Sequence, residues 1–183
     1  MSDLITLPSR LPVAPSDYGD ISVSRLGLKH LDSLCEACRA SASHVRPWLG
    51  NSLCPITPTA TRQCIEEMEK KRTSGYGITY LLMSGATCLG MGIINYIHPL
   101  HANANLGYWI RPEACGNGLA VNLCQSLAKL AFSQINLQRL ELFVEPGNKA
   151  SMRVADKLGA QREGLCRKRV FGRDAYLYAL LSQ

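Results

Sequence analysis

Apolar residues in the first part of the chain recur at intervals of three and four, the spacing of a helix that buries one face. This spacing predicts three helices before residue 75, over residues 28–40, 43–49 and 57–71. Residues 1–20 contain three prolines and show no period, so we expect an irregular N-terminal arm that leads into a strand near residues 21–26.

After residue 75 the apolar period falls to two, which is the spacing of strands that bury one face. Strands are expected at residues 78–83, 88–96, 106–110, 139–144, 166–171 and 175–181, and helices at 120–132 and 148–158. This order predicts an α+β fold, with a mixed, mostly antiparallel twisted sheet of about seven strands and helices on its faces. The length of 183 residues suits a single domain over residues 1–183.

Composition narrows the class of protein. Eight cysteines without an export signal favour reduced, mostly buried thiols over a disulfide framework. Only Cys35 and Cys38 lie close together in the sequence, and no second pair completes a zinc site, so no metal is expected. No apolar run is long enough to span a bilayer, so we expect no membrane partner and take the cytoplasm as the default location. The net charge of +6 attracts anions, which leaves both nucleic acid and a phosphorylated cofactor open.

Two glycines, Gly116 and Gly118, lie between an expected strand and an expected helix. Glycine lets the backbone approach a ligand closely, and the first N–H groups of a helix have no partners within it. The segment therefore suits a phosphate or pyrophosphate, although a tight turn without a ligand is the alternative. A dinucleotide-binding fold is disfavoured, because Val121 stands at the third glycine position and the preceding strands are antiparallel.

Four short motifs follow one another in the order and at the spacing of the GNAT superfamily of N-acetyltransferases. They are residues 106–110, 116–120, 148–151 with 157–159, and 162–164. From about Ile21 to the C-terminus the chain resembles the RimJ/RimL branch, which acetylates protein N-termini. The resemblance implies a sheet that is splayed open between the strands at 106–110 and 139–144, with acetyl-coenzyme A in the opening.

The resemblance also implies which residues bind this cofactor. The pyrophosphate is expected on the backbone amides of Gly116, Asn117, Gly118, Leu119 and Ala120. The pantetheine is expected along the backbone of Trp109, Ile110 and Arg111, with an N–H near Ile110 as the oxyanion donor. Asn148 and Ser151 are expected to contact the cofactor and also to cap the helix that they begin.

Cys115 departs from the family pattern, which usually has Gln or Arg at the head of the glycine loop. The departure predicts weaker cofactor binding or compensation by a nearby base such as Arg111 or Arg153. A thiol beside a helix N-terminus would also tend to have a lowered pKa.

The reaction needs a neutral amine and a proton for the departing thiolate. The resemblance assigns the base role to Glu163 and the acid role to Ser151, and Glu145, Glu113 or a water held by one of these acids remain alternative bases. The α-amino group has a pKa of about 7.7 to 8.0, against about 10.4 for lysine, so an N-terminal substrate needs only a mild base.

The resemblance favours a protein or peptide N-terminus as the acceptor, as in the ribosomal-protein enzymes. Acetylation of a small-molecule amine, such as an antibiotic or polyamine, and a non-catalytic acyl-coenzyme A-binding module remain open. We expect residues 39–61 and 170–174 to determine the acceptor. The basic stretch at 167–169 leaves ribosome association open, and a homodimer is equally left open.

Overall fold

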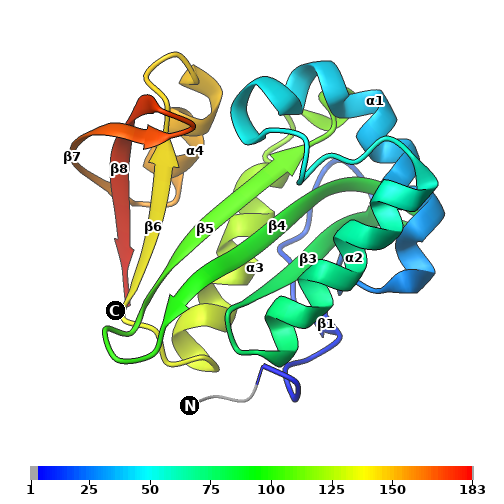
Figure 1. Cartoon of the computed structure of the whole chain (residues 1–183), viewed down its shortest axis with the longest axis horizontal. Coiled ribbons are helices and arrows are strands. Elements are labelled where there is room, and N and C mark those ends of the chain that lie inside the picture. The colour runs from blue at the N-terminus through cyan, green and yellow to red at the C-terminus, as the bar shows by residue number, and fades with distance from the viewer. Residues whose placement is uncertain (1–3, 183) are drawn as a thin grey trace.

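One mixed sheet runs through residues 4–182, the part of the chain that the computed structural model describes (Figure 1). Its strands are β1 (Arg10–Leu11), β2 (Ser22–Arg25), β3 (Gly77–Ser84), β4 (Thr87–His98), β5 (Asn103–Ile110), β6 (Arg139–Val144), β7 (Gln161–Val170) and β8 (Arg173–Leu181). They lie in the order β1-β2-β3-β4-β5-β6-β8-β7. The α+β prediction is confirmed, with eight strands rather than about seven, because part of the expected irregular arm pairs with β2 as β1.

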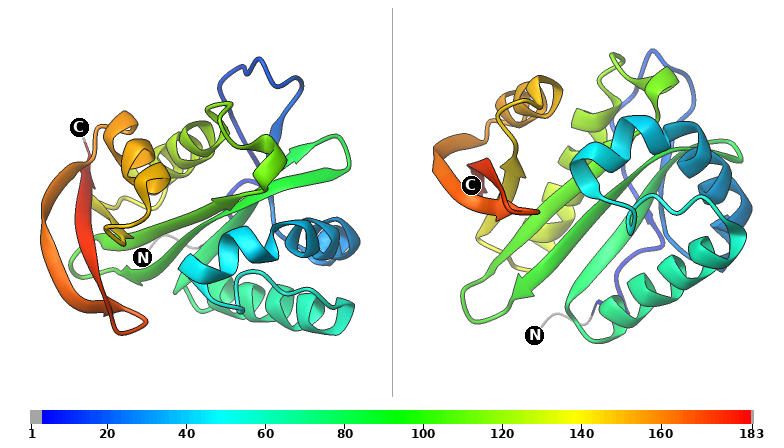
Figure 2. Two further views of the ribbon diagram at one scale, coloured as in Figure 1. Left: turned by 90° about the horizontal axis from the view of Figure 1, so that it is seen from above. Right: turned by 45° about the horizontal axis from the view of Figure 1, so that its top comes forward.

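Helices cover both faces of the sheet, two on each face (Figure 2). They are α1 (Leu31–Leu49) and α2 (Pro58–Thr73) on one face, and α3 (Leu119–Ser133) and α4 (Lys149–Lys157) on the other. No helix among the described residues is long and apolar enough to cross a membrane.

The two separate helices expected at 28–40 and 43–49 are wrong, because α1 is continuous over 19 residues. Its buried face runs on through Ser41 and Val45, and a small serine at a buried position carries no apolar signal in the sequence. The helix expected at 57–71 is confirmed as α2, and Thr57 caps it by accepting a hydrogen bond from the N–H of Ala60 at 3.2 Å.

The sheet opens in its middle, between β5 and β6. These two strands are parallel and pair over three positions only, from Asn103 with Arg139 to Asn105 with Glu141. Beyond them the strands diverge, so β1 to β5 form one part of the sheet and β6 to β8 the other (Figure 1). The splayed sheet that the resemblance implied is confirmed.

The position of α3 depends on close contact with β4. A Cβ atom added at Gly92 would lie 2.5 Å from Cδ1 of Leu127 and 3.1 Å from Cγ of Leu123. Both leucines are fully buried. The absence of a side chain at Gly92 therefore lets α3 lie directly on the sheet, and this packing determines where the N-terminus of α3 lies.

We expect Gly92→Ala to lower the free energy of unfolding by about 1–3 kcal/mol, because the added methyl group overpacks the contact between β4 and α3. Urea unfolding measures the change. Gly164→Ala is the matched control, since a Cβ atom there meets no atom within 4 Å. Equal stability of the two variants would contradict this account of the packing.

Candidate active site

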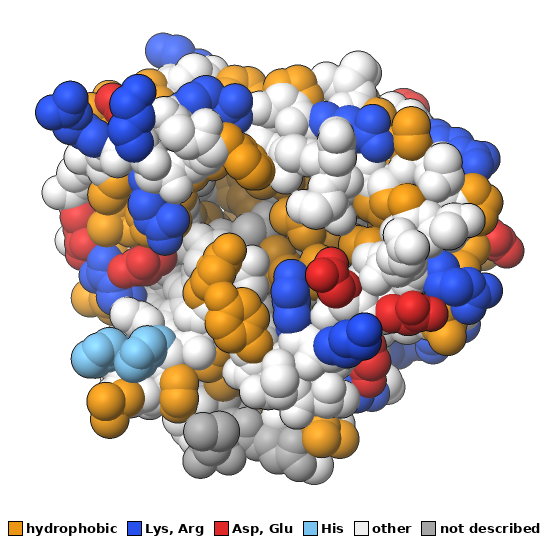
Figure 3. All heavy atoms as spheres, in the orientation of Figure 1, with side chains coloured by type: hydrophobic (Ala, Val, Ile, Leu, Met, Phe, Trp, Pro, Cys, Tyr) orange, Lys and Arg blue, Asp and Glu red, His pale blue; other side chains and the backbone are white. Residues whose placement is uncertain are grey.

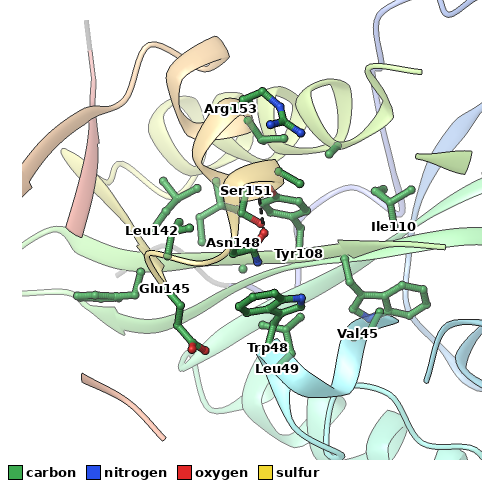
Figure 4. Close-up of a pocket in the computed structure, with 18 of the residues that line it drawn as sticks. Val45, Trp48, Leu49, Tyr108, Ile110, Leu142, Glu145, Asn148, Ser151 and Arg153 are labelled. Atoms are coloured by element: carbon green, nitrogen blue, oxygen red, sulfur yellow. Dashed lines mark hydrogen bonds between the residues drawn. The ribbon is translucent and has the colours of Figure 1, made fainter. Parts of the chain in front are cut away.

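A cavity of about 570 Å³ fills the opening between β5 and β6 (Figure 4). On one face of the sheet it is bordered by the N-terminal parts of α3 and α4, and on the other face by the end of α1. Figure 3 shows a hollow on the face that carries α1 and α2, with hydrophobic side chains around it. The cavity therefore reaches both faces of the sheet through the gap that the diverging strands leave.

The glycine loop enters α3 at the edge of this cavity. Gly116 and Gly118 have φ values of 87° and 74°, a left-handed conformation that other residues adopt at a cost. Neither glycine has an atom within 4 Å of an added Cβ, so the need for glycine here is conformational rather than steric. Asn117 holds the loop together, since its Nδ2 donates to the carbonyl oxygens of Ala114 and Cys115 at 3.2 Å. Its side chain thus stabilises the loop rather than lining the cavity.

The N-terminus of α3 has the properties of an anion site. Gly118 is its N-cap and offers no side-chain hydrogen bond, and the first turn contains no acidic residue. Leu119 and Ala120, the first residues of the helix, line the cavity together with Gly116 and Gly118. The unpaired N–H groups and the helix dipole favour a phosphate at this place.

The splayed part of β5 leaves one backbone edge open. The N–H of Arg111 donates to the carbonyl oxygen of Leu89 at 2.8 Å, toward β4. Because hydrogen bonding alternates along an antiparallel strand, the N–H of Trp109 also points toward β4, whereas those of Tyr108 and Ile110 point toward the opening. The backbone expected to hold a pantetheine is thus available at Ile110 and Tyr108, and Trp109 and Arg111 turn their N–H groups away.

The side chains of Trp109 and Arg111 hold the first part of the sheet to α1 and to the loop that follows it. The Trp109 Nε1–H donates to the carbonyl oxygen of Leu53 at 3.1 Å. Arg111 forms ion pairs with Glu36 at 2.9 Å and with Glu113 at 3.2 Å, and its side chain does not border the cavity.

Basic side chains reach the cavity from α4 instead. Arg153 and Lys157 both line it (Figure 4). Arg111 and Arg153 were both expected to compensate for the missing Gln or Arg at position 115, and of these two only Arg153 lines the cavity.

Cys115 lines the cavity, with its Sγ 3.8 Å from Nε2 of His44. The expected lowering of its pKa is wrong: partial burial, and secondarily the charge of Glu113, raise the pKa of this thiol. All eight cysteines are free, and six are buried, as the composition predicted. Among residues 4–182, no three His, Cys, Asp or Glu side chains group as a metal site would need.

The N-terminus of α4 brings two of the predicted site residues together. The Oδ1 of Asn148 accepts a hydrogen bond from the N–H of Ser151 at 3.1 Å, which confirms the helix cap. Both residues line the cavity, and Figure 4 shows them beside Tyr108. Tyr108 belongs to the motif at residues 106–110, and no role was expected for its side chain.

Glu163 lies on β7 and does not line the cavity. Its carboxylate accepts hydrogen bonds from Nη1 and Nη2 of Arg139 at 2.9 and 2.6 Å. These bonds hold the pKa of Glu163 below its ordinary value, which makes the carboxylate a weaker base. Glu113 is exposed, bound to Arg111 and also outside the cavity.

Of the three candidate bases, Glu163, Glu113 and Glu145, Glu145 is the one that borders the cavity. It directly follows β6, its side chain is only 13% exposed, and both of its oxygens accept hydrogen bonds from Arg173 at 2.7 Å. Arg173 also donates to the carbonyl oxygen of Pro47 at 2.9 Å, in the last turn of α1. The carboxylate is thus held in place beside Trp48 and Leu49 (Figure 4).

Two segments form the mouth of the cavity on the α1 side: the end of α1 with the loop after it, and the turn between β7 and β8. Val45, Trp48, Leu49 and Leu53 come from the first, and Val170 and Phe171 from the turn between β7 and β8. These residues belong to the ranges 39–61 and 170–174, which we expect to determine the acceptor. Phe171 packs against Gly50 across the opening, since a Cβ atom added at Gly50 would lie 3.2 Å from its Cζ.

Comparisons with known proteins agree with this fold. YdaF of Bacillus subtilis (strain 168), described as a proposed ribosomal N-acetyltransferase, is 26% identical over 169 residues, which cover 89% of this chain and 92% of that protein. The structure of Mycobacterium smegmatis RimJ in complex with a CoA-disulfide has a TM-score of 0.88 at 19% identity, covering 96% of this chain and 88% of that one. The structure of RimL, a ribosomal L7/L12 alpha-N-protein acetyltransferase in complex with coenzyme A, has a TM-score of 0.84 at 20% identity, covering 94% and 97%. Residues 21–161 match the acetyltransferase (GNAT) domain, and the chain therefore belongs to the GNAT acetyltransferase family.

Proposed function

We propose that this protein transfers an acetyl group from acetyl-coenzyme A to the N-terminal amine of a protein or peptide. One observation carries the proposal: a single cavity joins an anion-binding helix N-terminus on one face of the sheet to a held carboxylate on the other. A phosphorylated acyl donor fits the first end and a cationic amine fits the second.

The residues present fit acetyl-coenzyme A, which supplies an activated acetyl thioester. The amides of Gly116, Asn117, Gly118, Leu119 and Ala120 would bind its pyrophosphate. The open edge of β5 at Tyr108 and Ile110 would pair with its pantetheine, with the Ile110 N–H as oxyanion donor. Arg153 and Lys157 add positive charge at the phosphate end, which offsets the loss of the family's basic or amide side chain at Cys115. The complexes of RimJ and RimL with forms of coenzyme A support this assignment.

Glu145 suits the base role better than Glu163, because it lines the cavity and Glu163 does not. In this role Glu145 attracts the acceptor ammonium group and accepts its proton, directly or through a water. Ser151 lines the cavity at the N-terminus of α4, and its hydroxyl would stabilise the departing thiolate there.

The acceptor assignment follows from the basicity of the acceptor amines. An N-terminal amine, with a pKa of about 8, loses its proton far more readily than lysine and therefore needs only a mild base. The description of RimL as an alpha-N-protein acetyltransferase supports the same class of acceptor.

Thiol release from acetyl-coenzyme A tests the proposal, with N-terminal peptides, internal lysine peptides and small amines offered in parallel. We expect turnover with free N-termini and none with the same peptides blocked by acetylation. Turnover with small amines only would show that the acceptor is a small-molecule amine and not a protein or peptide N-terminus. Absence of turnover with every amine, while coenzyme A still raises the melting temperature, would favour a non-catalytic acyl-coenzyme A-binding module.

Glu145→Gln is expected to lower kcat/KM for N-terminal peptides by about 10²-fold, a typical effect of removing a general base. Glu163→Gln is expected to change it by less than about threefold, because exposed ion pairs contribute little. Steady-state kinetics on both variants, with coenzyme A affinity as a check of folding, measure the difference. The reverse order of effects would return the base role to Glu163.

Gly118→Ala is expected to weaken coenzyme A binding by roughly tenfold, equivalent to about 1.4 kcal/mol, because the strained backbone moves the loop amides. Gly85→Ala is the matched control, since Gly85 also has a positive φ, of 55°, but lies in the turn between β3 and β4. Both variants should lose a similar amount of stability, on the order of 1 kcal/mol. Calorimetric titration with coenzyme A that shows unchanged affinity for Gly118→Ala would contradict a pyrophosphate site at this loop.

A further inference from the structure

The phenol of Tyr108 has a hydroxyl group without a partner. Among the described residues, three buried side-chain oxygens have no hydrogen bond: Oγ of Ser41, Oγ1 of Thr79 and Oη of Tyr108. Tyr108 alone of these three residues lines the cavity. An unpaired buried hydroxyl destabilises a protein by about 1–3 kcal/mol, so its place in the cavity calls for a functional partner.

Ser151 is a candidate partner for this hydroxyl. Figure 4 shows the ring of Tyr108 beside Ser151 and Asn148, where β5 and the N-terminus of α4 approach each other across the opening. Burial raises the pKa of the Tyr108 phenol well above its ordinary value, and the Ser151 hydroxyl opposes this rise. The two hydroxyls are therefore neighbours, although their geometry falls short of a full hydrogen bond.

The surroundings of the phenol keep it protonated. Burial is the largest cause of the raised pKa of this hydroxyl. A hydroxyl that does not ionise at neutral pH is a poor proton source, but it is a permanent hydrogen-bond donor. Tyr108 is thus suited to orient another group rather than to give up its own proton.

We propose that Tyr108 is a positioning residue for the departing thiolate: its O–H donates to Oγ of Ser151, so that the Ser151 O–H points at the sulfur. The inference rests on the proposed function. As the amide bond forms, the C–S bond breaks and its electron pair remains on sulfur. The proton that neutralises the thiolate comes from the acceptor nitrogen, and neither Tyr108 nor Ser151 loses one.

Titration of bound coenzyme A tests the inference without catalysis. The thiolate absorbs in the near ultraviolet, so its pKa in the complex can be followed against pH. Donors aimed at sulfur lower that pKa, and we expect Tyr108→Phe to weaken the acidity of the bound thiol by about tenfold, the equivalent of one hydrogen bond. Ser151→Ala should do the same or more. An unchanged thiol pKa in Tyr108→Phe would overturn the proposal.

A double-mutant cycle separates this role from independent contacts. Tyr108→Phe should lower kcat by about tenfold with KM for the peptide changed less than twofold, and should have almost no further effect in the Ser151→Ala background. Additive effects of the two substitutions would show that Tyr108 does not act through Ser151. An inactive wild-type protein would overturn the proposed function, whereas an active one with an unaffected Tyr108→Phe variant would overturn this inference alone.

Tyr80→Phe is the matched control for stability. Its hydroxyl is bonded, since Oη donates to the carbonyl oxygen of Pro8 at 2.7 Å. Without ligand, Tyr80→Phe should lower the melting temperature by about 2–4 °C, and Tyr108→Phe should leave it unchanged or raise it. A loss in Tyr108→Phe equal to that in Tyr80→Phe would assign the Tyr108 hydroxyl a structural role and overturn the proposal.

Discussion

The divergence of β5 from β6 is the constraint on which the rest of the site depends. Three residue pairs join these strands, and every backbone group of β5 beyond them that faces β6 is left without a partner in the sheet. Unpaired backbone groups are stabilised when a ligand pairs with them. The gap between β5 and β6 thereby creates the cavity and leaves the edge of β5 open beside it. The same gap separates the part of the molecule that carries the glycine loop from the part that carries Glu145.

The two parts of the sheet are joined again at the other end of the gap. Arg173 links Glu145 to the last turn of α1, and Phe171 packs on Gly50 just beyond that helix. The cavity is therefore held open between two fixed connections, the short β5–β6 pairing at one end and the contact of the β7–β8 turn with α1 at the other. Such a frame can keep reacting groups on opposite faces at a constant separation.

Local features of the site were predictable from sequence, and long-range pairings were not. The glycine loop, the Asn148 cap and the Thr57 cap each depend on a few neighbouring residues, so short-range spacing is enough to find them. Glu163 and Glu145 look alike in the sequence, because which of them faces the cavity depends on their arginine partners, Arg139 and Arg173, each more than twenty residues away. The unpaired hydroxyl of Tyr108 gives no sequence signal at all, since the absence of a hydrogen bond is a property of packing. The motifs that resembled a family nevertheless indicated the splayed sheet, which no local pattern contains.

Arg173 connects the position of the proposed base to the width of the acceptor mouth. Its Nη2 donates both to Glu145 and to the carbonyl oxygen of Pro47, so a displacement of α1 that breaks one bond also alters the other. Trp48 and Leu49, which border the mouth, belong to the same turn of α1. An acceptor too wide for the mouth would have to move this turn, and in doing so it would change the hydrogen bonding of Glu145, the proposed base. The width of the mouth and the position of the proposed base are thus not independent in this fold, because Arg173 bonds both to Glu145 and to the last turn of α1.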